Sequence, residues 1–188
     1  RNLVLIAIGT GIGAGLIIDG ALYRGAHQAA GEIGYVLPGK EALGRRYEGF
    51  GALESLASGT GVAERARRIL AGEMKPDRLE RLSAEDVFDA ARRGETWATT
   101  VINETVDYLA IAIAAVSVLL DPDLIVLGGS ASTSADLLVE PILRRIEGVL
   151  PVTPHLAVSS LGRRAVVLGT ITAILHNTIE HYVVRKLS

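Results

Sequence analysis

Short apolar runs and glycine-rich turns alternate along the start of the chain, which is the pattern of a β-meander. Residues 3–8 (LVLIAI) and 16–18 (LII) are apolar runs, separated by residues 9–15 (GTGIGAG) with four glycines. Asp19-Gly20 then gives the signal of a two-residue hairpin turn, and Ala21-Leu22-Tyr23 follows. The pattern predicts three antiparallel strands joined by two tight turns.

Helical spacing dominates the middle of the chain. A helix is predicted from about residue 52 to 72, with interruptions at Ser58-Gly59 and Gly61. Residues 83–86 (SAED) resemble a capping box, so a short helix is expected over 83–93. A longer helix is expected over 95–120, because the residue before a proline disfavours the helical region and Pro122 follows.

Strands and helices alternate in the last third. Residues 124–130 (LIVLGGS) are predicted to be a buried strand closed by two glycines, followed by a helix over 135–148, a strand over 156–160 and a last helix over 166–184. Alternating strands and helices after a meander predict the α/β class, a mixed sheet with helices on its faces. Ligands of such folds collect at the carboxyl ends of strands, where both glycine turns are expected.

Composition narrows the class of protein. The chain has 188 residues, 49% of them hydrophobic and 4% aromatic, which fits a compact fold with an aliphatic core. Nineteen basic and 21 acidic residues give no surplus for a nucleic-acid or anionic-membrane surface. The most apolar run, 109–120, is shorter than the roughly 20 residues that cross a bilayer, so it predicts a buried helix. The chain begins with Arg1 rather than methionine, and we expect its natural beginning to lie upstream.

The first glycine segment admits several kinds of loop. A Walker A loop is excluded, because no lysine precedes Lys40. A dinucleotide fingerprint requires a helix after the glycines, whereas β-propensity residues 16–18 follow here. A glycine turn between antiparallel strands remains, either as an anion site built from backbone N–H groups or as a tight hairpin without a ligand.

Acidic residues flank a long irregular segment over 25–51. Glu32 and Tyr35 lie within GEIGY, and Glu54 falls in the first turn of the next predicted helix. A loop of this length in a compact domain is usually functional, and its apolar content argues against disorder. The alternatives are an ordinary loop acid at Glu32 and, at Glu54, an acid favoured by the helix dipole. The arginine doublets at 45–46, 67–68 and 163–164 are expected on solvated faces.

Three segments together resemble the ROK family of repressors, open reading frames and kinases, within the actin/hexokinase-like ATPase fold. They are GTGIGAGLIIDGALYRGAHQAAGEIG, ALESLASG and DPDLIVLGGS, in the family's order and spacing. The resemblance implies that residues 1–188 are the C-terminal lobe, with the N-terminal lobe and any DNA-binding domain elsewhere. Its fold would be a ribonuclease H-like lobe, a mixed sheet with helices on its faces.

The resemblance also implies the site residues. The phosphate loop would consist of Gly9, Thr10, Gly11 and Gly13, and the adenosine would lie against Gly128 and Gly129. By the same match, Glu32 and Glu54 would bind sugar hydroxyls, with Tyr35 beside them. ATP with magnesium is the cofactor implied.

Zinc is where the sequence departs from the family. Family members usually have a histidine ending GEIGH and a cysteine-rich segment after it; this chain has Tyr35 and LGRRYEGFG, and it contains no cysteine. We therefore expect no zinc. The four histidines show no i, i+4 pairing with carboxylates and are expected at the surface or in packing.

Two functions follow from the resemblance. The first is the sugar-sensing lobe of a transcriptional regulator, favoured by the lost zinc residues, with DNA bound only through an upstream domain. The alternative is the C-terminal lobe of an ATP-dependent sugar kinase, favoured by the unbroken GTGIG and LGGS. The family's DxGxT hairpin and catalytic aspartate are absent, so we expect no catalysis by this chain alone. A cytoplasmic homodimer without membrane attachment is expected.

Overall fold

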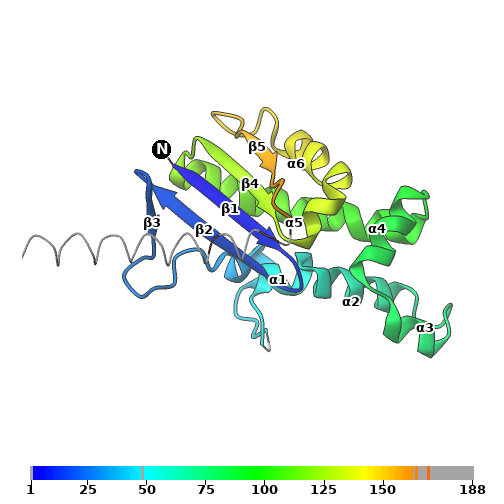
Figure 1. The fold of residues 1–188 in the computed structure, drawn as a ribbon. Coiled ribbons are helices and arrows are strands. Elements are labelled where there is room, and N and C mark those ends of the chain that lie inside the picture. Colours follow the sequence, from blue (N-terminus) through cyan, green and yellow to red (C-terminus); the bar gives the residue numbers. More distant parts are fainter. Residues whose placement is uncertain (1, 48, 163, 165–168, 170–188) are drawn as a thin grey trace, which may run out of the picture.

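A five-stranded mixed sheet forms the centre of the chain in the computed structural model, which describes residues 2–47, 49–162, 164 and 169. The strands are β1 (Leu3–Ile8), β2 (Ile12–Ile18), β3 (Ala21–Tyr23), β4 (Leu124–Gly128) and β5 (Leu156–Val158), in the order β3-β2-β1-β4-β5 (Figure 1). The pairs β1–β2 and β2–β3 are antiparallel, whereas β1–β4 and β4–β5 are parallel. The predicted meander and the mixed sheet are both confirmed.

The turn between β2 and β3 forms as its sequence predicts. Asp19 has φ 51° and Gly20 φ 82°, and Ile18 pairs with Ala21 across the turn. Two successive positive φ values define the turn type whose twist matches that of paired strands, and aspartate and glycine tolerate them best. The local sequence thus fixes the register of this hairpin.

Six α-helices and three 3-10 segments connect the strands within the described ranges. They are η1 (Ile33–Tyr35), η2 (Lys40–Ala42), α1 (Ala52–Ala57), α2 (Gly59–Ile69), α3 (Pro76–Arg81), α4 (Ala84–Arg92), α5 (Thr96–Leu120), η3 (Ser130–Leu137) and α6 (Val139–Ile146). The capping box at Ser83 and Asp86 is present, so the helix predicted there is confirmed.

Three of the helix predictions need correction. The chain breaks at Ser58 but not at Gly61, which lies inside α2; a Cβ at Gly61 would stand 2.4 Å from the Ser55 carbonyl oxygen, so this glycine permits close packing of α1. The single helix expected over 135–148 is instead η3 followed by α6, with a kink at Ser134. The short helix α3 was missed, because its six residues bury none of their side chains and carry no amphipathic signal.

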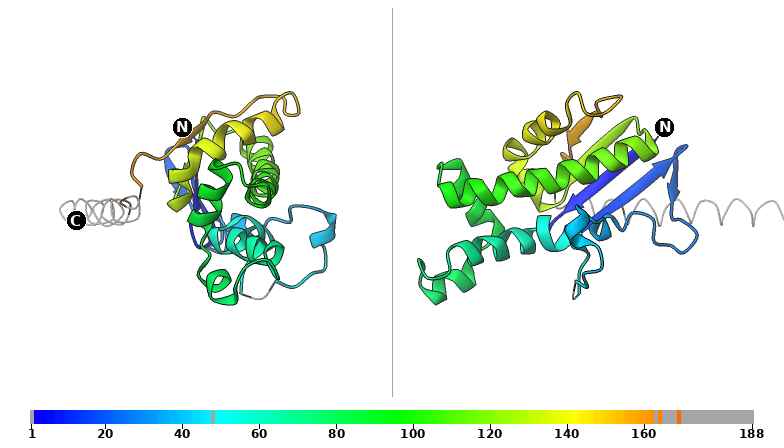
Figure 2. Two further views of the ribbon diagram at one scale, coloured as in Figure 1. Left: turned by 90° about the vertical axis from the view of Figure 1, so that its right-hand side faces the viewer. Right: turned by 180° about the vertical axis from the view of Figure 1, so that it is seen from behind.

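The described helices lie to one side of the sheet, and α2, α3 and α4 extend past the ends of its strands (Figure 1 and Figure 2). Between them and the sheet lies one continuous aliphatic core, which includes Ile6, Leu53, Leu109, Ile113, Ile125 and Ile142. Alternation along β1 directs Val4, Ile6 and Ile8 into this core. The core therefore holds the carboxyl end of β1 against the helices that follow the hairpin.

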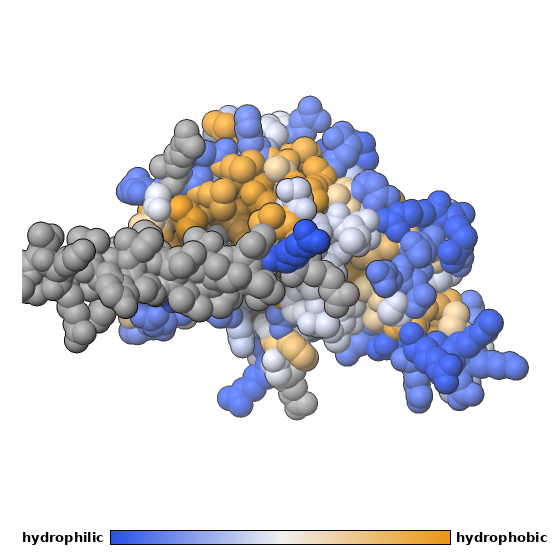
Figure 3. Space-filling model, viewed as in Figure 1, coloured by the Kyte–Doolittle hydropathy of each residue, from blue (hydrophilic) through white to orange (hydrophobic). Residues whose placement is uncertain are grey.

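The opposite face of the sheet is also apolar. By register, Leu3, Leu5, Val126 and Ala157 share this face, and apolar side chains gather over β1, β4 and β5 in Figure 3. None of the helices that the structure describes lies over it. The helix predicted over 166–184 falls outside the described residues.

Helix α5 is buried on one side only. The run over 109–120 is predicted to be buried, whereas Ile111, Val118 and Leu119 are 44%, 61% and 80% exposed within this chain. Helix α5 forms the outer layer over the sheet, and none of the described elements covers its outer side (Figure 2). By length and hydropathy α5 also meets the criterion for a membrane-crossing helix, as core helices often do.

Arg67 is not on a solvated face as expected. Its Nε donates to the Leu79 carbonyl oxygen at 2.9 Å, and its Nη2 donates to the Leu82 carbonyl oxygen at 2.7 Å. These carbonyls lie at the end of α3, which has few partners of its own. Arg67 therefore holds α3 and the following turn against α2.

Candidate functional site

The first residues of α2 hydrogen-bond to the turn between β1 and β2. The amide of Gly59 donates to the Gly9 carbonyl oxygen at 2.7 Å, and the Thr60 hydroxyl donates to the Thr10 carbonyl oxygen at 2.9 Å. The turn comprises Gly9, Thr10 and Gly11, whereas Gly13 lies in β2 opposite Ala7. Two carbonyls of the turn are thus drawn toward α2.

The amides at the tip of the turn remain available. Within the described part of the chain, no acceptor takes the N–H of Thr10 or of Gly11, and Thr10 is exposed. The N-terminus of α2 is directly adjacent, and its dipole favours negative charge. Free amides beside a helix N-terminus suit a phosphate oxygen.

A second glycine turn adjoins the first. Gly129 has φ 79°, and a Cβ on it would stand 2.3 Å from the Ile8 carbonyl oxygen. Ser130 reaches the same place, because its Oγ would lie 3.8 Å from a Cβ built on Gly9. The carboxyl ends of the parallel strands β1 and β4 therefore bring the two glycine turns together, as the sequence predicts.

Glu54 lies against the β1–β2 hairpin. Its Oε2 accepts a 2.6 Å hydrogen bond from the amide of Ile12, the first residue of β2. A Cβ on Gly11 would approach the same oxygen to 2.6 Å, and a Cβ on Gly34 would lie 3.2 Å from the Glu54 Cβ. The carboxylate thus fits between two glycines, and its Oε1 receives no hydrogen bond from a described residue.

The GEIGY segment packs beside Glu54. The amide of Ala14 donates to the Gly31 carbonyl oxygen at 2.7 Å, and a Cβ on Gly51 would stand 2.1 Å from the Gly34 carbonyl oxygen. Glu32 precedes η1 and is exposed, and Tyr35 is 64% exposed. The acid and the phenol are therefore open to solvent on a segment that β2 and α1 hold in place.

Metal ligands do not cluster in the described part of the chain. No group of three or more histidine, cysteine, aspartate or glutamate residues is positioned to hold a metal ion there. His27 and His155 are exposed, and His176 and His181 lie outside the described residues. The absence of zinc stays a prediction.

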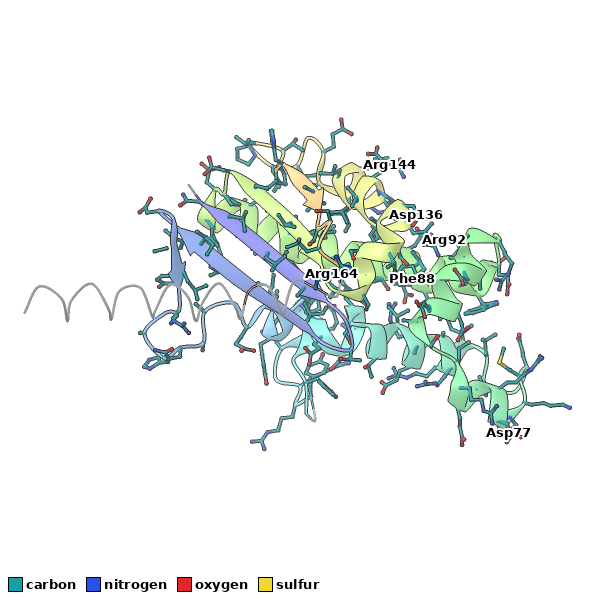
Figure 4. The ribbon with its side chains drawn as sticks, in the orientation of Figure 1. Asp77, Phe88, Arg92, Asp136, Arg144 and Arg164 are labelled. Carbon is teal, nitrogen blue, oxygen red and sulfur yellow. The ribbon has the colours of Figure 1, made fainter. Side chains whose placement is uncertain are left out.

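Ionisable groups with shifted pKa values lie away from the hairpin. Arg92 of α4 and Asp136 of η3 point toward one another (Figure 4), with Nη2 to Oδ1 at 2.8 Å. This hydrogen-bonded pair lowers the pKa of Asp136 and raises that of Arg92. Burial lowers the pKa of Arg65, which is opposed by its hydrogen bond to Glu104. These groups fasten helices rather than face the glycine turns.

The fold and the glycine turns define a lobe of the actin/hexokinase-like ATPase class. The ROK family profile matches residues 1–177, and the chain belongs to the ROK family. The predicted family and fold are thereby confirmed.

Both sugar kinases and sugar repressors occur among the relatives. A glucokinase from Halalkalibacterium halodurans is 34% identical over 90% of this chain and 54% of its own length. A ROK glucokinase from Streptomyces griseus, solved with glucose and AMPPNP, is 25% identical at TM-score 0.69, covering 87% of this chain and 57% of its own. A ROK transcriptional regulator, a homolog of the E. coli MLC protein, is 34% identical at TM-score 0.69, covering 84% and 41%. This chain spans about half the length of its curated relatives.

Proposed function

We propose that this chain is the sugar- and nucleotide-binding lobe of an ATP-dependent sugar kinase. The observation that carries the proposal is the pair of free amides at Thr10 and Gly11, held beside the N-terminus of α2 and one residue from the Glu54 hydrogen bond to Ile12. A sensor that binds only sugar has no use for an anion site at this place. A sugar kinase needs the phosphate and the sugar side by side.

The hairpin would hold the nucleotide phosphates. Thr10 and Gly11 would donate their amides to phosphate oxygens, and the dipole of α2 would stabilise the negative charge. Gly129 lies next to this hairpin, since a Cβ on it would stand 2.3 Å from the Ile8 carbonyl oxygen, and the adenosine would lie against this second turn. ATP supplies the phosphoryl group, with magnesium bound to its phosphates.

The two acids would orient the sugar. Glu54 already uses Oε2 for the Ile12 amide, so Oε1 would accept a hydrogen bond from a sugar hydroxyl. Glu32 would accept a second, and Tyr35 would present its hydroxyl from the same segment. A carboxylate that bonds both the sugar and the phosphate hairpin would couple the positions of the two substrates.

A transcriptional regulator is the second candidate. Its support is the ROK regulator that is 34% identical over 84% of this chain, together with the absence of cysteine from the sequence. In that case the lobe would bind sugar, and DNA would be bound by another part of a longer protein. Nucleotide binding separates the two candidates.

Calorimetric titration with magnesium-AMPPNP tests the kinase proposal. We expect saturable binding to the wild-type chain and its loss in Gly11→Ala, because the new Cβ would collide with Glu54. Gly15→Ala is the matched control, since nothing lies within 4 Å of a Cβ there. Sugar binding without nucleotide binding would favour the regulator. In either case we expect no turnover in a coupled kinase assay, because the sequence contains neither DxGxT nor the family's base.

The exposed side of α5 would serve for self-association. Ile111, Val118 and Leu119 are exposed, and their spacing of seven and eight residues places them on one face of its carboxyl-terminal half. Contiguous apolar surface of this kind marks interfaces in soluble proteins. We accordingly place the interface of the expected homodimer on α5.

A further inference from the structure

A cavity lies between the loop 38–47 and helix α1, and none of the glycines of the two turns lines it. Its volume is about 390 Å³, and it is bounded by the loop 38–47, by α1 and α2, and by Tyr108 of α5. The loop overlaps residues 43–51 (LGRRYEGFG), which stand where ROK proteins usually have a cysteine-rich segment. We call the cavity the arginine pocket, and its polar lining consists of Glu41, Arg45, Arg46, Tyr47, Ser55, Glu64, Arg68 and Tyr108.

The loop that forms one wall of the arginine pocket is anchored. Ala42 is 2% exposed, and successive turns join the Ala42 amide to the Gly39 carbonyl oxygen at 3.1 Å and the Arg45 amide to the Ala42 carbonyl oxygen at 3.3 Å. Pro38, also part of the lining, is buried. The backbone before Arg45 and Arg46 is therefore fixed against the helices, which limits the entropy lost when these side chains bind a ligand.

The charge of the lining favours an anion. Its ionisable groups include three arginines and two glutamates, Glu41 and Glu64. Among the described residues, the ion pair assigned within this lining is Arg68–Glu64 at 3.7 Å, and none is assigned to Arg45 or Arg46. Guanidinium groups that form no ion pair with a described residue suit the planar, bidentate recognition of phosphate.

A fourth arginine, Arg65, lies next to the Tyr108 ring. The guanidinium of Arg65 is 5.6 Å from the centre of the Tyr108 ring, and its side chain is 8% exposed. Its Nη1 bonds Glu104 at 2.7 Å, but its Nε has no partner among the described residues. Because Glu104 offsets the charge of Arg65, the role of this arginine is to hold the Tyr108 ring that lines the pocket.

The remaining lining groups suit a sugar. Tyr47, Tyr108 and Leu56 supply apolar surface for a ring, while Ser55 and the two glutamates can bond hydroxyls. The volume exceeds that of an inorganic anion and falls within the range of small-molecule sites. We propose that the arginine pocket binds a phosphorylated monosaccharide, with Arg45 and Arg46 on the phosphate.

Such a ligand would contact the helix that carries Glu54. Ser55 lines the arginine pocket, and it directly follows Glu54 in α1. A phosphorylated sugar in the arginine pocket would therefore contact Ser55, the residue after Glu54, whose carboxylate bonds the β1–β2 hairpin. This site is distinct from the one assigned to sugar and nucleotide above, and it does not depend on that proposal.

Calorimetry with glucose 6-phosphate, fructose 6-phosphate, mannose 6-phosphate and inorganic phosphate tests the proposal. We expect at least one sugar phosphate to bind with a Kd below about 1 mM, and inorganic phosphate to bind about tenfold more weakly. Arg45→Gln with Arg46→Gln is expected to weaken the sugar phosphate by about tenfold or more. Arg81→Gln with Arg144→Gln is the control: it removes the same charge outside the lining and leaves affinity unchanged.

The assignment is overturned by any of three results. The first is no binding of a sugar phosphate up to about 10 mM. The second is an equal loss of sugar-phosphate affinity in the two double variants, which would mean a nonspecific effect of charge. The third is binding that survives Arg45→Gln with Arg46→Gln but is lost in Glu54→Gln, because the ligand would then occupy the site at the hairpin. Circular dichroism of each variant verifies its fold.

Discussion

The Oε2 atom of Glu54 accepts a 2.6 Å hydrogen bond from the amide of Ile12, which joins a side chain on α1 to the hairpin 42 residues earlier. The bond matters because Ile12 follows Thr10 and Gly11, whose amides have no acceptor among the described residues. A carboxylate fixes the backbone more strongly than a neutral acceptor does. Glu54 therefore sets the position of the turn, and in the proposed complex its Oε1 would accept a hydrogen bond from the sugar.

Glu54→Gln is expected to weaken both functions of this side chain. Loss of a charge-assisted hydrogen bond costs about 1.5–3 kcal/mol, so we expect sugar affinity to fall by about 10- to 100-fold. Amide exchange at Ile12 should also become faster. Glu140→Gln on α6 is the control, because that acid forms only an exposed ion pair with Arg144 at 3.5 Å. Equal affinities of the wild type and Glu54→Gln would contradict the assignment.

Gly129→Ala is expected to destabilise the fold by about 3 kcal/mol or more, because a positive φ and a steric clash act together. The new Cβ would stand 2.3 Å from the Ile8 carbonyl oxygen. Gly148→Ala separates the two effects, since Gly148 has φ 70° but no atom within 4 Å of a built Cβ. Urea unfolding should give Gly129→Ala a clearly lower free energy of unfolding than Gly148→Ala. Similar losses would mean that the contact with β1 has no role.

The Arg92–Asp136 pair predicts a pH dependence of stability. The hydrogen bond to Arg92 lowers the pKa of Asp136 below its ordinary value of 3.8. The contribution of the pair is therefore present above about pH 4 and is lost as the pH falls through the lowered pKa. Because both side chains are partly exposed, we expect Asp136→Asn to cost only about 0.5–1 kcal/mol at neutral pH and progressively less as the pH falls through the lowered pKa of Asp136.

Urea unfolding at neutral and acidic pH measures this difference. Asp77→Asn on α3 is the control, because no ion pair is assigned to Asp77 in the described part of the chain (Figure 4). A cost of Asp136→Asn that stays the same at both pH values would contradict the role of the pair.

Val118→Ser with Leu119→Lys is expected to abolish self-association through α5. These residues are 61% and 80% exposed, and a buried lysine at an apolar interface carries a large desolvation cost. Light scattering should give twice the monomer mass of 19.8 kDa for the wild type and the monomer mass for the variant. A monomeric wild type, unchanged on tenfold concentration, would exclude the dimer.

The elements that could be predicted from sequence are those with local signals. Asp19-Gly20 specifies a turn by its own backbone preferences, and Ser83 with Asp86 caps α4 without help from the rest of the chain. The kink at Ser134 has no such signal, because tertiary packing decides between one helix and two segments. Local propensity thus accounts for the strands and the capped helices.

The candidate site could be predicted only in part. The two glycine turns meet because β1 and β4 are parallel neighbours, which the order of strands and helices suggests. The bond from Ile12 to Glu54 and those from Arg67 to the end of α3 join distant residues, and no spacing in the sequence reports them. Side-chain contacts to backbone groups therefore had to come from the structure.

Nuclear magnetic resonance of the backbone amides tests the central claim most directly. On addition of magnesium-AMPPNP, we expect saturable shifts at Thr10, Gly11 and Gly129, and glucose should shift Ile12 through its bond to Glu54. We assign the amides of Thr10 and Gly11 to the phosphate and that of Gly129 to the adenosine. The amide of Ile12 reports on the Glu54 carboxylate, which would bind the sugar. Saturable binding that leaves all four amides unmoved, or no binding of either ligand, would contradict the account.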